Sequence, residues 1–150
     1  MSPGRPDGGR ALIEVVFLAV LLLIPVVYIL AAVLRLQSAT LAVAQAARDV
    51  GRLIETAPDA GTLGSAGDVA RVALQDQNVS PDRLQLRTVA PGADCRQAPE
   101  VDATLRPGAS YDVCVIAVIT LPGVPTVLSG SDNTVTGVYS VHIGELREGR

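Results

Sequence analysis

The sequence predicts an α+β protein in which a long N-terminal helix precedes a small antiparallel β-sheet. Three observations lead to this prediction: an uncharged apolar run at 15–34, a helical repeat that continues to 56, and strand-like segments between 84 and 144. The chain has 150 residues, 49% of them hydrophobic and 3% aromatic, with a formal net charge of −3. This composition argues against a disordered chain and against a nucleic-acid-binding protein, which would carry a basic face.

The apolar run from Val15 to Leu34 is long enough to cross a membrane. A helix of this length extends about 30 Å, the thickness of the hydrocarbon core of a bilayer. A helix buried in so small a domain would need a polar face, and this run has none. Pro25 lies within the run, where membrane helices tolerate it. An alternative is a secretory signal peptide cut after Ala42-Val43-Ala44, although the apolar part of such peptides spans only about 7–15 residues.

The two cysteines indicate on which side of the membrane the C-terminal part lies. Cys95 and Cys114 both follow the apolar run, and an even number of cysteines there fits a disulfide formed in an oxidising compartment. We therefore expect a single-pass membrane protein with its N-terminus in the cytoplasm and its C-terminal domain outside. Two unpaired, buried cysteines are the alternative.

Beyond the apolar run, the helix is expected to continue to about Thr56. Leu36, Val43 and Val50 recur every seven positions, and small alanines lie between them. This stripe faces either the chain's own globular part or neighbouring helices, and both alternatives are open.

The remainder of the chain is expected to form a linker and a small domain. Residues 57–67, with Pro58 and several glycines, predict the linker, and residues 68–150 the domain. In that domain, Asp68 is expected to cap a short helix that ends near Asp76. Strands are predicted at 84–89, 111–121 and 134–144; the second is central because both of its faces are apolar. Turns are predicted at Pro107-Gly108, Pro122-Gly123 and Ser129–Asn133.

Glu14 is a carboxylate at the edge of the apolar run. An ionised acidic residue near the centre of a bilayer costs about 2.5–3.5 kcal/mol and less at its edge, so Glu14 is a functional candidate that needs a partner. The simpler alternative is an interfacial carboxylate near the start of the helix, where the helix dipole favours negative charge.

The residues around Glu14 resemble a known processing site. Gly9-Arg10-Ala11-Leu12-Ile13-Glu14, followed by an apolar helix, is similar to the cleavage site of type IV pilins and pseudopilins. The continuation to residue 54, which includes Gln45-Ala46-Ala47-Arg48, looks like the N-terminal region of TadE/TadG-like minor pilins of the tight-adherence (Flp) system.

This resemblance implies a processing step and a set of partners. A prepilin peptidase would remove a leader at 1–9 by cutting between Gly9 and Arg10, leaving a transmembrane and amphipathic helix at 10–56. Glu14 would then neutralise the new α-amine of Arg10 in an adjacent chain. The implied partners are the peptidase, other pilin subunits, the tight-adherence assembly machinery and the lipid bilayer, and the implied role is assembly or priming of an Flp-type pilus.

Two other classes of function compete with this one. An uncleaved signal-anchor protein would use its outer domain to bind a partner. An enzyme is not expected, because His142 stands without other candidate metal ligands and neither a nucleophile elbow nor a phosphate-binding glycine loop is present. No cofactor or metal is expected.

Overall fold

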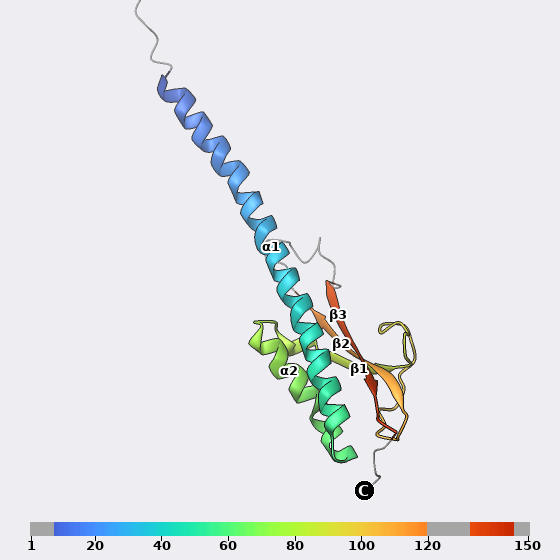
Figure 1. Cartoon of the computed structure of the whole chain (residues 1–150). Coiled ribbons are helices and arrows are strands. Elements are labelled where there is room, and N and C mark those ends of the chain that lie inside the picture. Colours follow the sequence, from blue (N-terminus) through green and yellow to red (C-terminus); the bar gives the residue numbers. More distant parts are fainter. Residues whose placement is uncertain (1–7, 120–132, 146–150) are drawn as a thin grey trace, which may run out of the picture.

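A long helix that projects from a small globular part dominates the computed structural model (Figure 1). The structure describes residues 8–119 and 133–145, with the backbone alone for residues 8–10. Its elements in chain order are α1 (Gly8–Thr56), the 3-10 helix η1 (Ala60–Ser65), α2 (Ala66–Asp76), the 3-10 helix η2 (Pro81–Arg83), β1 (Gln85–Val89), β2 (Ser110–Val118) and β3 (Thr134–His142). The predicted α+β class, with a long N-terminal apolar helix and a small antiparallel sheet, is confirmed.

Helix α1 is unbroken over 49 residues, which corresponds to about 74 Å. It continues through Pro25 and ends at Thr56, as the sequence predicts. The end has a local cause: Pro58 disfavours helical backbone at the residue before it. In the last turn, Thr56 Oγ1 donates a hydrogen bond to the carbonyl oxygen of Arg52 at 2.7 Å. The apolar run and the amphipathic part are therefore one continuous rod.

The C-terminal half of α1 is the middle layer of the globular part, with α2 on one side and the sheet on the other (Figure 1). The predicted stripe thus faces the chain's own domain. Leu36 is an exception because it is 47% exposed, so burial begins one turn later, at Ala39. The buried residues of this half are mostly small: Ala39, Ala42, Val43, Ala46, Ala47, Val50 and Ile54.

The sheet is antiparallel in the order β1-β2-β3, with β2 in the centre as predicted. Leu86 of β1 pairs with Val115 of β2, which pairs with Gly137 of β3. On β2, alternate residues from Tyr111 to Ala117 face α1, and Cys114 lies on the opposite face within a second, smaller apolar cluster. The predicted strands at 111–121 and 134–144 are observed with shorter C-terminal ends, at Val118 and His142.

Two glycines let α1 and β3 approach very closely. A Cβ atom added to Gly137 would lie 2.1 Å from the carbonyl oxygen of Val43, so backbone meets backbone there. Two turns further along α1, the ring of Tyr139 covers Gly51, and an added Cβ would lie 2.0 Å from that ring. These glycines remove the side chains that would otherwise hold helix and strand apart.

The segment expected as a linker is more ordered than predicted. It contains η1, which begins where Asp59 Oδ1 accepts a hydrogen bond from the backbone N–H of Thr62 at 3.0 Å. Helix α2 then begins at Ala66, so Asp68 lies in its first turn and does not cap it. Gly108 has a φ of 77°, in agreement with the turn predicted there. The turns predicted at 122–123 and 129–132 lie outside the described residues.

Candidate functional site

The N-terminal half of α1 is an apolar surface that the globular part does not cover. Among the described residues, one helix is long and apolar enough to cross a membrane, and none of its most apolar window is buried. Exposed fractions of 65% at Val15 and 64% at Leu34 mark the two ends of the run. An exposed apolar surface of this size needs an apolar environment. The structure therefore supports association with a lipid bilayer as a single-pass protein.

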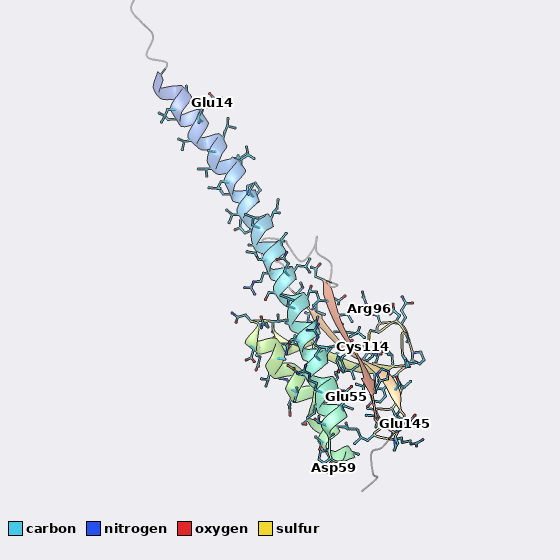
Figure 2. The ribbon with its side chains drawn as sticks, viewed as in Figure 1. Glu14, Glu55, Asp59, Arg96, Cys114 and Glu145 are labelled. Atoms are coloured by element: carbon cyan, nitrogen blue, oxygen red, sulfur yellow. A yellow bond between two sulfur atoms is a disulfide. The ribbon has the colours of Figure 1, made fainter. Side chains whose placement is uncertain are left out.

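Glu14 lies near the free end of α1, on the far side of the apolar run from the globular part (Figure 2). The axial rise from Glu14 to Arg35 is about 32 Å, so the two charged residues bracket one bilayer core. Glu14 is exposed, and no residue whose side chain is described gives it a hydrogen bond or an ion pair. The backbone of Gly9 and Arg10 belongs to α1. The structure thus brings no partner to Glu14 from the described part of its own chain.

Cys95 and Cys114 form a disulfide, as the sequence predicts, with their Cα atoms 5.8 Å apart. Both are buried, and they pack with Val89 and Ile116 on the face of the sheet opposite α1. The disulfide attaches the long connection between β1 and β2 to the central strand.

Arg87 also holds the connection between β1 and β2 in place, a role that the sequence pattern did not predict. Its guanidinium donates to the carbonyl oxygens of Cys95 at 2.7 Å and Ala98 at 2.9 Å. It also forms an ion pair with Glu100, with 2.7 Å between Nε and Oε1. The side chain of Arg87 is 20% exposed, so these bonds are partly shielded from water. An arginine in an alternating strand pattern carries no sequence signal for such a role.

Asp112 is a buried charged residue whose role the sequence pattern did not predict. It lies on β2, is 4% exposed, and accepts a hydrogen bond from the backbone N–H of Gly92 at 2.7 Å. Its other carboxylate oxygen, Oδ1, is buried without a hydrogen-bond partner among the described residues. The signal in the sequence was an acidic residue inside an otherwise apolar, β-branched run.

Glu55 joins the end of α1 to the end of β3. Its Oε2 atom accepts a hydrogen bond from the hydroxyl of Tyr139 at 3.3 Å, and its Oε1 atom accepts one from the backbone N–H of His142 at 3.4 Å.

His142 is exposed at the end of the edge strand β3. Within residues 8–119 and 133–145, no group of three or more histidine, cysteine or acidic residues could hold a metal ion.

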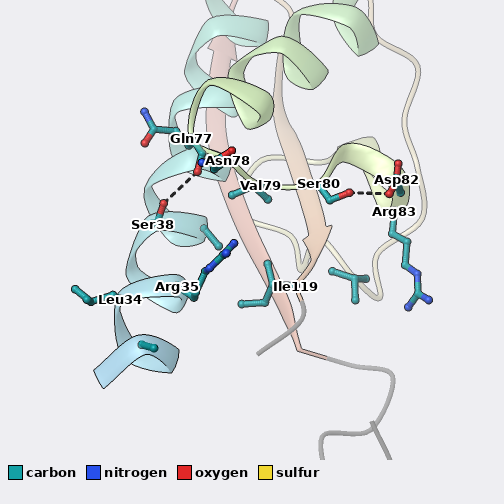
Figure 3. A pocket seen from close by; sticks show the side chains of 13 residues that line it. Leu34, Arg35, Ser38, Gln77, Asn78, Val79, Ser80, Asp82, Arg83 and Ile119 are labelled. Atoms are coloured by element: carbon teal, nitrogen blue, oxygen red, sulfur yellow. Dashed lines mark hydrogen bonds between the residues drawn. The ribbon is translucent and has the colours of Figure 1, made fainter. Parts of the chain in front are cut away.

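A cavity of about 770 Å³ opens where α1 leaves the globular part (Figure 3). Its walls come from α1, from the α2–η2 connection and from the end of β2. In Figure 3 the guanidinium of Arg35 points from α1 into this cavity, whereas the side chain of Arg83 points outward from η2. The polar residues around it are Arg35, Ser38, Gln77, Asn78, Ser80, Asp82 and Arg83.

Comparisons of the chain with protein-family models, with curated proteins and with solved structures find no match.

Proposed function

We propose that the protein is a membrane-inserted minor pilin or pseudopilin that takes part in assembly or priming of an Flp-type pilus. One observation carries the proposal: an exposed, uncharged helical run of bilayer length, with Glu14 at its N-terminal end, continues without a break into a folded domain. A subunit of this kind can reside in a bilayer and then exchange lipid for sister helices, because both environments bury the same apolar surface. The role is structural and not catalytic.

In this proposal, a prepilin peptidase cuts between Gly9 and Arg10 and releases the leader at 1–9. The N-terminus lies in the cytoplasm and the globular domain outside, in keeping with the disulfide. Glu14 pairs with the new α-amine of Arg10 in a neighbouring subunit. Such a pair is valuable in an apolar environment because either charge alone would be costly to bury.

The first experiment determines the mature N-terminus of the membrane-extracted protein by intact-mass analysis and N-terminal sequencing. A chain that begins at Arg10 supports the proposal, and Gly9→Val should then retain the leader. The matched control is Gly8→Val, which makes the same change one residue upstream and should leave processing intact. A chain that still carries residues 2–9 would contradict the peptidase step.

The second experiment tests the partner of Glu14 directly. All twelve basic Lys/Arg positions are arginine, so the chain has no lysine and the α-amine is its one amine. A membrane-permeant carbodiimide, which joins carboxylates to amines at contact distance, should therefore cross-link Arg10 of one subunit to Glu14 of another. Glu14→Gln should abolish the cross-linked dimer, and Glu145→Gln, which removes an exposed carboxylate from the globular part, should not.

The second candidate function is that of an uncleaved signal-anchor protein whose outer domain binds a partner. The observation in its favour is that α1 is already helical at Gly8, so the bond between Gly9 and Arg10 lies within a helix. This candidate predicts a retained leader, no cross-link, and normal behaviour of Glu14→Gln. The two experiments above distinguish it from the pilin proposal.

A further inference from the structure

The cavity beside Arg35 lies at the level of the lipid headgroups if the apolar run spans the bilayer. The run from Val15 to Leu34 matches a hydrocarbon core of about 30 Å. The headgroup layer adds about 5–8 Å on each side, since a whole bilayer measures roughly 40–45 Å. From Leu34 to Ser38, both of which line the cavity, α1 rises about 6 Å. The helical wall of the cavity therefore covers the depth of one headgroup layer.

The chemistry of the walls suits an anionic phosphate group. Arg35 points into the cavity, and no described residue gives its guanidinium a hydrogen bond or an ion pair (Figure 3). Arg83 adds a second positive charge at the rim, and Asp82 a negative one. The Asp82 carboxylate already accepts a hydrogen bond from Ser80 Oγ at 2.7 Å. The residues of these walls carry a net charge of +1, because they include two arginines and one aspartate, and of the two arginines only Arg35 points into the cavity.

Guanidinium groups bind phosphate through paired hydrogen bonds, and arginine can extend its charged end toward the polar layer while its stem stays on apolar surface. The apolar part of the wall, which includes Ala31, Leu34 and Ile119, lies on the side where acyl chains begin. A volume of about 770 Å³ is within the range of roughly 300–1,000 Å³ typical of small-ligand sites. The size, charge and depth of the cavity therefore all fit the phosphate group of a lipid as its ligand.

We propose that this cavity binds the phosphate of an anionic phospholipid headgroup in the leaflet next to the globular domain, with Arg35 as the main contact. The bound lipid would fix how deeply α1 sits and how the domain rests on the membrane. This inference requires insertion in a bilayer, but it depends neither on leader cleavage nor on the pairing of Glu14. Its failure is therefore distinguishable from failure of the pilin proposal.

The test is native mass spectrometry of the full-length protein in detergent micelles, with phosphatidylglycerol or phosphatidylcholine added. The wild type should retain one phosphatidylglycerol and little phosphatidylcholine. Arg35→Gln should lower retention about fivefold, the effect expected when one basic side chain near an anionic lipid surface contributes about 1 kcal/mol. Arg35 is exposed, so the variant should fold, and unchanged near-ultraviolet circular dichroism would verify this.

The matched control is Arg52→Gln, which removes the same charge from an exposed position of the same helix about 25 Å further from the apolar run. It should leave lipid retention unchanged. An equal loss in both variants, or equal retention of the two lipids, would overturn the proposal. Inorganic phosphate is the third arm: if the wild type retains it in an Arg35-dependent manner but does not retain phosphatidylglycerol, the site is one for a free anion, and the assignment to a lipid is wrong.

Discussion

Replacing Gly137 with alanine should destabilise the globular part, although the same change in an open strand would stabilise it. Glycine within a strand costs roughly 0.5–1 kcal/mol relative to alanine, because the unfolded chain loses more freedom on folding. Replacement of glycine by alanine therefore stabilises a strand, but only where the added methyl group has room. At Gly137 the added Cβ would lie 2.1 Å from the carbonyl oxygen of Val43, and real Cβ atoms essentially never approach closer than 3.0 Å.

The size of the loss follows from this overlap. Helix and strand must separate by roughly 1 Å, and a gap of 0.5–1 Å forfeits about a quarter to a half of the dispersion energy of the atoms that face it. Overpacking of a core typically costs about 1–3 kcal/mol. Because the obstructing atom belongs to the backbone of α1 and cannot rotate away, we expect the upper part of this range, about 2–3 kcal/mol.

Thermal unfolding of the full-length protein in micelles, followed by near-ultraviolet circular dichroism of tyrosine, measures this effect. At about 4–8 °C per kcal/mol for a domain of this size, Gly137→Ala should lower the midpoint by roughly 10–20 °C. The matched control is Gly67→Ala in α2, where an added Cβ meets nothing within 4 Å. That change should raise the midpoint slightly, because alanine has the higher helix propensity.

A midpoint that stays constant or rises in Gly137→Ala would contradict this expectation. It would mean that β3 does not lie against the backbone of α1 in the folded protein, and the account of α1 as a middle layer would fail with it.

Three further predictions concern the contacts that hold the sheet and its long connection. Reduction of the Cys95–Cys114 disulfide should cost about 3 kcal/mol by the loop-entropy estimate, seen as a lower unfolding midpoint in the presence of a thiol. Arg87→Gln should cost about 1–3 kcal/mol because it removes charged hydrogen bonds to two carbonyl groups, and hydrogen exchange should accelerate first in the connection between β1 and β2. Tyr139→Phe should cost only about 0.5 kcal/mol, since its bond to Glu55 is long and partly solvated; a loss above roughly 2 kcal/mol would contradict that view.

The elements governed by local sequence pattern could be predicted. The helix to Thr56 follows from its repeat and from Pro58, and the central strand from the β-branched run around Val115. The cysteine pair could be named because the chain contains two cysteines in all. In each case the information lies within a few neighbouring residues or in a simple count.

Features that depend on contacts between distant segments could not be predicted. The close approach at Gly137 joins residues more than ninety positions apart, and a glycine in a strand pattern does not reveal which backbone will meet it. Arg87 resembled any solvent-facing residue of an edge strand. The cavity beside Arg35 exists because the middle of α1, the α2–η2 connection and the end of β2 lie near one another, and none of these segments alone carries a sequence signal for it.

The continuity of α1 has a mechanical consequence. Where a membrane anchor and a domain are joined by a flexible tether, a pull on the domain first straightens the tether. Here a single helix, α1, contains both the apolar run and the part that lies between α2 and the sheet. This second part packs closely against β3 at Gly51 and Gly137. A force applied to the globular part is therefore transmitted at once along the helix axis, and a rotation of the domain turns the apolar segment with it.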